Sequence, residues 1–64
     1  SDSAREWLQE FFDAVGSDTV PTKQTLAAAK EAGYSRATVE RLLRELRDAR
    51  ELDRPSRGLY RRAK

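Results

Sequence analysis

Apolar positions near the start of the chain recur at the spacing of one helical face. They follow the i, i+3, i+4 rule between residues 3 and 15 without a gap. These positions are Ala4, Trp7, Leu8, Phe11, Phe12 and Val15. Ser3 or Ser1 can cap the start, and Gly16 provides a left-handed stop. The pattern predicts a helix over 3–15, and we expect its aromatic side chains in the core because so small a domain needs them inside.

The next segment changes from extended to helical character. Pro21 pushes its predecessor toward extended geometry, which predicts a short strand over 19–21. Thr22 is expected to cap a second helix over 22–32, where consecutive alanines favour helix and let a neighbouring helix approach closely. Leu26 is the only large apolar residue of this segment, so we expect it to be the main anchor of the helix in the core.

A glycine separates the second helix from a third one. Gly33 is expected to end the second helix, and Ser35 to cap the next. A stripe of apolar residues at helical spacing predicts this third helix over 35–50. The stripe consists of Val39, Leu42, Leu43 and Leu46. Ala29, a small residue four before the glycine, allows the two helices to cross closely at a steep angle, as in a helix–turn–helix.

The C-terminal part alternates apolar and polar residues, as half-buried strands do. A Pro-Ser-Arg-Gly turn separates the two alternating segments, which predicts a β-hairpin, or wing, over 52–62. Leu52 and Leu59 are expected to face the core, and Tyr60 the other side. Together the elements predict one domain over 1–64, mainly α with a small β-hairpin (α+β), in the order helix, strand, helix, helix, strand, strand.

Charge is distributed unevenly along the chain. The net charge is +2, but residues 1–33 carry three basic and six acidic side chains, a net of −3. Residues 34–64 carry ten basic and five acidic side chains, a net of +5. Such a separation lets one face meet a polyanion while the other faces water. A basic tail that keeps a small domain soluble is the plainer alternative.

The residue types that the chain lacks limit its chemistry. Its 64 residues include no cysteine and no histidine, so disulfides and thiolate metal sites are excluded, and the commonest general base is missing. No glycine-rich phosphate loop, nucleophile–base set or long apolar run is present. We therefore expect no catalysis, no metal or other cofactor, no small-molecule ligand and no membrane segment, and a cytoplasmic location.

One stretch of the chain carries a family resemblance. It is Gly33-Tyr34-Ser35-Arg36-Ala37-Thr38-Val39, followed by Leu42, Leu46 and Leu52 and by the turn Arg57-Gly58-Leu59-Tyr60. With the order of the elements, it resembles the winged helix–turn–helix DNA-binding domains over essentially the whole chain, and its motif is most similar to that of GntR-type regulators. The resemblance implies that the third helix enters the major groove and that the wing touches the adjacent backbone or minor groove.

The resemblance and the chemistry of a helix in the groove predict DNA contacts from two elements. The expected contacts of the third helix are Ser35, Arg36, Ala37, Thr38, Arg41 and Arg44. Those of the wing are Arg54, Arg57, Gly58, Arg61 and Arg62. Ser35 lies at a helix N-terminus, which suits a phosphate, and Arg36 has the donors to grip guanine O6 and N7. We expect Arg36 to be the arginine least engaged by acids of its own helix.

Interactions within the protein are the alternative use of these arginines. Four pairs at i, i+4 spacing in the third helix would each add a few tenths of a kcal/mol to an exposed helix. They are Glu40–Arg44, Arg41–Glu45, Arg44–Asp48 and Arg47–Glu51. In the wing, charges on an exposed strand edge also deter aggregation.

These observations predict a sequence-specific module that binds double-stranded DNA. The alternative is a protein-interaction module that docks an acidic partner, because the fold also serves protein contacts. One copy offers few contacts, so we expect weak binding unless additional domains or several copies act together on repeated sites. The parent protein is expected to be a regulator, or a plasmid- or phage-encoded replication or DNA-transfer protein. The sequence does not distinguish among transcription, replication and DNA transfer.

Overall fold

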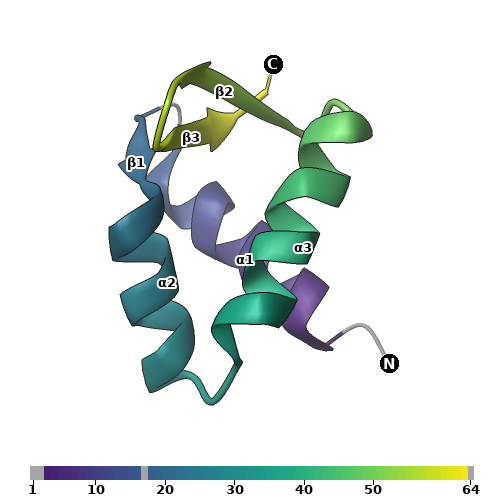
Figure 1. Ribbon diagram of the computed structural model, residues 1–64. Helices are drawn as coiled ribbons and strands as arrows, with labels where there is room; N and C mark the ends of the chain where they lie inside the picture. Colours follow the sequence, from purple (N-terminus) through teal and green to yellow (C-terminus); the bar gives the residue numbers. More distant parts are fainter. Residues whose placement is uncertain (1–2, 17, 64) are drawn as a thin grey trace.

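Three helices and a three-stranded antiparallel sheet make up the protein (Figure 1). The computed structural model describes residues 3–16 and 18–63. In chain order the elements are α1 (Ser3–Val15), β1 (Val20–Pro21), α2 (Thr22–Glu31), α3 (Arg36–Asp48), β2 (Leu52–Ser56) and β3 (Leu59–Arg62). The predicted fold class, mainly α with a small β component, and the predicted order of elements are confirmed.

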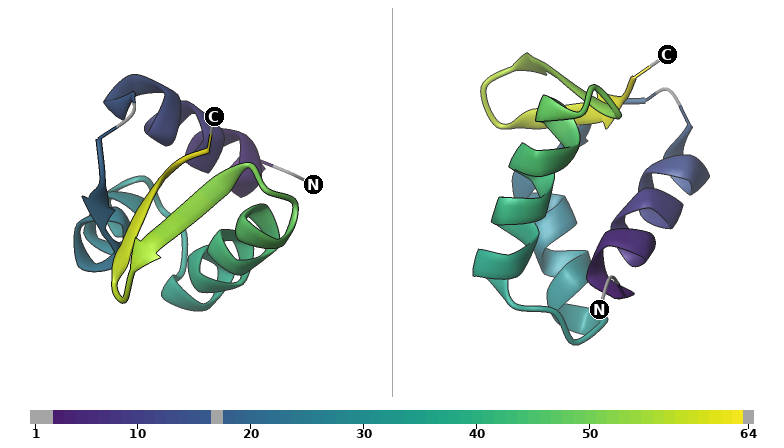
Figure 2. Two further views of the ribbon diagram at one scale, coloured as in Figure 1. Left: turned by 90° about the horizontal axis from the view of Figure 1, so that it is seen from above. Right: turned by 90° about the vertical axis from the view of Figure 1, so that its right-hand side faces the viewer.

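The helices surround one core, and the sheet closes one end of it. In Figure 1, α2 and α3 meet at the bottom through a short turn, and the sheet lies across the end where α2 begins and α3 finishes. In the right-hand view of Figure 2, α1 and α3 lie on opposite sides of the molecule. All three helices and two of the strands contribute buried apolar residues: Leu8, Phe12, Val20, Ala29, Val39, Leu42, Leu43, Leu46 and Leu52.

The aromatic residues of α1 divide between the centre and the edge of the core. Phe12 is fully buried, whereas Trp7 and Phe11 are half-buried and pack against the core from its rim. The Trp7 ring stacks on Phe11 with centroids 5.4 Å apart and lies 5.7 Å from the ring of Tyr34 in the turn before α3. This aromatic contact joins α1 to the α2–α3 turn, and such pairs add about 0.5–1.5 kcal/mol beyond area burial.

The anchor of α2 differs from the prediction. Leu26 is only half-buried, and the fully buried residues of this helix are Thr25 and Ala29. The Thr25 hydroxyl donates to the carbonyl oxygen of Pro21 at 3.4 Å, which satisfies its polar group inside the core. The prediction was wrong because two small side chains let α2 lie close to α3, and this turns the bulkier leucine toward the edge.

The start of α2 also differs from the prediction, since Thr22 is the first helical residue and Pro21 occupies the N-cap. No side chain caps this end. Instead the Thr22 N–H donates to the carbonyl oxygen of Gly58 in the hairpin turn at 2.8 Å. A backbone group from a distant part of the chain therefore replaces the expected side-chain cap.

Two helices end in the same hydrogen-bonding pattern. After α2, the N–H groups of Gly33 and Tyr34 bond back to the carbonyl oxygens of Lys30 and Ala29 at 3.1 and 2.9 Å. This is a Schellman motif with a glycine, at φ +93°, in the left-handed position.

The end of α3 closes in the same way but with an arginine in the left-handed position. The N–H groups of Arg50 and Glu51 bond to the carbonyl oxygens of Arg47 and Leu46 at 3.0 and 2.9 Å. Arg50 has φ +64°, so the helix cannot continue through it. This motif corrects the predicted end of the third helix from residue 50 to Asp48.

The strand register corrects the predicted face of β3. Tyr60 pairs with buried Val20, and directly opposed residues share a face, so Tyr60 packs against the core. Leu59 pairs with Pro21 on the other face. The register of β2 against β3 shifts between Asp53 and Ser56, which is a β-bulge. The extra residue breaks the simple alternation from which Leu52 and Leu59 were both expected to face the core. Leu52 does so, whereas Leu59 does not.

Candidate nucleic-acid interface

A groove of about 540 Å³ runs between α3 and the β2–β3 hairpin. We call it the arginine groove. Its lining residues are Thr22, Arg36, Glu40, Leu43, Arg44, Arg47, Arg54, Arg57, Gly58 and Tyr60. Half-buried Tyr60 and buried Leu43 provide apolar surface within it, and the five arginines are all exposed.

One bank of the groove is a single stripe of α3. At about 100° per residue, positions four, seven and eleven after Arg36 return to the same side of a helix. This spacing places Glu40, Leu43 and Arg47 beside Arg36, with Arg44 at the edge of the stripe toward solvent. The apolar stripe that fills the core therefore fixes which arginines reach the groove.

The other bank is the hairpin. Arg54 lies two residues after buried Leu52, within the bulged part of β2, and Arg57 lies in the turn. Gly58 has φ +79° and completes that turn. The backbone hydrogen bond from Thr22 to Gly58 fixes the turn over the start of α2, so the hairpin bank is held in place without ligand.

Most arginines of the groove have no ion-pair partner in the part of the chain that the structure describes. Among the described residues, no ion pair involves Arg44, Arg47, Arg54 or Arg57. Four unpaired cations from two elements thus surround one concave surface. Such a surface attracts a polyanion, because like charges held together raise the local positive potential.

Arg36 is the exception, because it pairs with an acid of its own helix. The expectation that it is the arginine least engaged by such acids was therefore wrong. The Nε atom of Arg36 donates to Oε2 of Glu40, four residues on, at 3.4 Å. Both side chains remain exposed, at 77% for Arg36 and 46% for Glu40. Glu40 is the one acid among the described residues that line the groove.

The small residues predicted to contact DNA lie at the start of α3 and are not among the residues that line the arginine groove. The Thr38 N–H donates to Oγ of Ser35 at 3.3 Å, and the Ser35 hydroxyl donates to Oγ1 of Thr38 at 2.8 Å. Ser35 is thereby confirmed as the N-cap of α3. Ala37 is exposed next to them, and Thr38 is half-buried.

Arg41 lies outside the groove and pairs within its own helix. Its Nη1 atom lies 3.3 Å from Oε2 of Glu45, which confirms one of the four predicted i, i+4 pairs. Among the described residues the other three pairs do not form. Glu40 pairs with Arg36 instead of Arg44, and Glu51 pairs with a residue of α1 instead of Arg47.

The last two predicted wing contacts also lie outside the arginine groove. Arg61 faces Asp53 across the hairpin, with Nε 3.9 Å from the carboxylate. Arg62 pairs with Asp13 of α1, with Nη1 at 2.9 Å from Oδ1. The structure therefore brings Arg36, Arg44, Arg54, Arg57 and Gly58 together, and leaves Arg41, Arg61 and Arg62 in ion pairs elsewhere.

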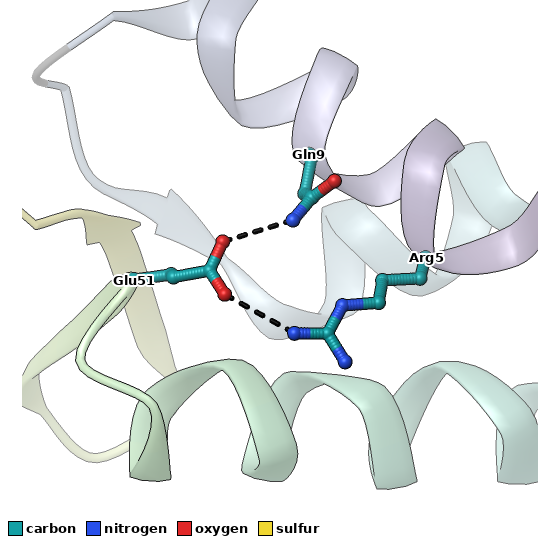
Figure 3. A network of polar contacts seen from close by, with 3 residues as sticks. All are labelled: Arg5, Gln9 and Glu51. Atoms are coloured by element: carbon teal, nitrogen blue, oxygen red, sulfur yellow. Dashed lines mark hydrogen bonds and ion pairs between the residues drawn. The ribbon is translucent and has the colours of Figure 1, made fainter. Parts of the chain in front are cut away.

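A second polar network on the α1 side explains where Glu51 points (Figure 3). Its carboxylate accepts from Nη2 of Arg5 at 3.1 Å and from Nε2 of Gln9 at 2.9 Å. Its backbone carbonyl accepts from the N–H of Ala63 at 3.0 Å. Glu51 thus joins α1, the α3–β2 connection and the end of β3, and this leaves Arg47 unpaired on the groove side.

Sequence reasoning missed Arg47 and Tyr60 as groove residues. Arg47 lies on the same flank of the helical wheel as Arg36, so its place was readable from the sequence. Arg47 was expected to pair with Glu51 and was therefore not predicted as a groove residue. Glu51 pairs instead with Arg5, which lies forty-six positions away and could not be recognised as its partner from the local sequence. The position of Tyr60 depends on the β-bulge, for which the alternating pattern gives no signal.

Several other kinds of site are not found in the described residues. Within the described ranges 3–16 and 18–63, no group of three or more acidic, histidine or cysteine side chains could hold a metal ion. None of the helices in these ranges combines the length and the apolar composition needed to cross a bilayer. Comparisons with protein-family models, with curated proteins and with solved structures each give no match.

Proposed function

We propose that this chain is a sequence-specific module that binds double-stranded DNA, with α3 in the major groove and the hairpin on the adjacent backbone or minor groove. One observation carries the proposal: four arginines without ion-pair partners among the described residues converge from two elements on one groove. Duplex DNA presents about one negative charge per 1.7 Å of axis, and released counterions favour binding wherever cations replace them.

The dimensions of α3 suit this placement. A helix of 13 residues is about 20 Å long, and a helix about 10–12 Å across fits a major groove about 12 Å wide. The exposed side of α3 carries Arg36 and Arg44 as well as Ala37, whose small side chain permits close approach. Ser35 stays next to the free N–H groups of the first turn, where a phosphate is favourable.

The proposal also assigns the chain to the winged helix–turn–helix type, similar to GntR-type regulators, on the strength of the motif from Gly33 to Val39 and the turn at Arg57-Gly58. The hairpin would then be the wing. The host is a larger regulatory, replication or DNA-transfer protein in the cytoplasm. Additional domains or self-association on repeated sites would add the affinity that one small module lacks.

The test is binding of labelled duplex DNA, measured by fluorescence anisotropy across a range of salt concentrations. We expect about four to six phosphate contacts and a slope of log K against log salt of about −4 to −5. Arg57→Ala should weaken binding to every duplex about fivefold to tenfold near 0.1 M salt and reduce the slope by about 1. Arg36→Ala should instead reduce the preference for the specific site.

The matched control is Arg50→Asn. It also removes one positive charge, and asparagine tolerates the left-handed backbone of this exposed position outside the groove. Its effect on duplex binding should be less than about twofold. Equal losses in Arg57→Ala and Arg50→Asn would contradict the proposed interface. Absence of duplex binding together with binding of an acidic peptide would favour the protein-interaction alternative.

A further inference from the structure

An acid in the middle of a basic groove needs an explanation. Glu40 lies on the same stripe of α3 as Arg36 and Arg47, and it faces the groove with 46% of its side chain exposed. A carboxylate at this place repels phosphates and so weakens general binding to DNA. A gain elsewhere, in stability or in recognition, must offset this loss.

Helix stability is a weak reason for the Arg36–Glu40 pair. Arg36 is the first residue of α3, and a cation at a helix N-terminus is unfavourable with respect to the helix dipole. The first turn of α3 contains no acid. The order of the pair, basic residue first and acidic residue four later, is also the less stabilising of the two possible orders.

The atoms that the pair leaves free suit a base pair. The hydrogen bond uses Nε of Arg36 and Oε2 of Glu40. Both terminal nitrogens of the guanidinium remain available, and no hydrogen bond among the described residues reaches Oε1 of Glu40. Two parallel donors match the O6 and N7 acceptors of guanine, and a carboxylate oxygen matches the N4 amino donor of cytosine.

We infer that Arg36 and Glu40 act as one base-reading unit that selects a C·G pair, with Glu40 as the specificity-determining residue. This inference rests on the proposed binding of duplex DNA through α3. Glu40 orients the guanidinium through Nε, so that its two free nitrogens meet guanine, and accepts from cytosine through Oε1. The same carboxylate disfavours the use of Arg36 as a simple phosphate contact, which would carry no sequence information.

The test is selection of bound duplexes from a random pool by the unmodified chain and by Glu40→Gln, followed by affinity measurements on the selected sites. The unmodified chain should select at least one invariant C·G pair. Glu40→Gln should bind random duplex more tightly, yet lose at least about fivefold in discrimination for that pair and shift toward A·T, because glutamine reads adenine N6 and N7.

The matched control is Glu45→Gln. The Arg41–Glu45 pair has the same order, the same spacing and similar exposure, at 67% and 44%, but it lies outside the arginine groove. Glu45→Gln should leave the selected sequence unchanged. If Glu40→Gln also leaves it unchanged, or if both variants alter it alike, the base-reading role is overturned while the proposed function stands. Absence of any duplex binding by the unmodified chain at low salt would overturn the proposed function itself.

Discussion

Arginines on the α1 side of this protein form ion pairs, whereas most of those on the groove side do not, among the described residues. On the α1 side, Arg5 meets Glu51 at 3.1 Å and Arg62 meets Asp13 at 2.9 Å, each across a long separation in sequence. On the groove side, Arg47 and Arg54 form no ion pair among the described residues, although they carry the same charge and are exposed, as Arg62 is. The paired arginines connect elements of the fold, whereas the unpaired ones remain available to a ligand.

The comparison shows that the number of arginines is a poor guide to a binding surface. What matters is which acids the fold brings near each of them. The ion pair with Arg5 holds Glu51 toward α1, and this removes its carboxylate from the groove side of α3. The positive potential of the arginine groove is thus partly a consequence of ion pairs made elsewhere.

Charge reversal on the groove side should give the largest effect. We expect the double variant Arg44→Glu/Arg47→Glu to reduce duplex affinity more than about 100-fold, since two attractive contacts become repulsive ones. The loss in the free energy of unfolding, followed by circular dichroism, should be modest, about 1 kcal/mol, because no native ion pair among the described residues is broken and the cost comes only from new carboxylates near Glu40, Asp48 and the C-terminal end of α3. A large loss of stability with binding retained would reverse the distinction between the two sides.

Removal of an acid on the α1 side should act on stability instead. Glu51→Ala removes the acceptor of Arg5 and Gln9, and we expect a loss of about 1 kcal/mol in the free energy of unfolding, a modest value because both charged groups are partly exposed. Urea denaturation measures it. Duplex affinity should stay within about twofold, and a larger drop would mean that this network also shapes the groove.

Arg50 belongs to neither group and gives a third prediction. It adopts φ +64° at the end of α3, where the equivalent position after α2 is Gly33. Arg50→Gly relieves the left-handed strain at some cost in unfolded-state entropy, so the chain should gain about 0.5 kcal/mol. The midpoint of thermal unfolding should rise by about 2–4 °C. A decrease would show that the arginine side chain itself stabilises the turn.

The smallest change in binding is expected for Arg62→Ala, because the ion pair with Asp13 directs this side chain toward α1. Duplex affinity should fall less than about twofold, against about fivefold or more for Arg57→Ala. Anisotropy titrations of the two variants under the same salt conditions make the comparison direct. Equal losses would place Arg62 in the interface after all, as the basic C-terminal sequence alone suggests.

Local patterns were sufficient to predict the elements of the fold. Helical spacing of apolar residues, the N-cap at Ser35 and the glycine after α2 give three helices in the correct order, and the alternation after residue 50 gives the hairpin. The errors arose where a distant group replaced a local one. The carbonyl of Gly58 replaced a side-chain cap at Thr22, and the β-bulge exchanged the faces of Leu59 and Tyr60.

The candidate interface was predictable for residues whose direction a helix or a turn fixes. Arg36, Arg44 and Arg57 lie in the groove for this reason. Ion-pair partners were not predictable in the same way, because a guanidinium on a flexible side chain chooses among acids that only the tertiary fold brings within reach. Arg62 and Arg47 illustrate the two outcomes. Arg62 pairs with Asp13, which is distant in sequence. Arg47 has no such partner, because Glu51, the acid expected to pair with it, pairs with the distant Arg5 instead.

The hydrogen bond between the Thr22 N–H and the Gly58 carbonyl has a consequence for how this protein can change. It links the hairpin to the helical body through main-chain atoms alone. Provided that Gly58 keeps its φ of +79°, the exposed side chains on both sides of the groove can be exchanged without altering the separation of the two sides. The scaffold therefore separates the shape of its surface from the chemistry displayed on it, and the groove can be given other chemistry by varying a few exposed positions of α3.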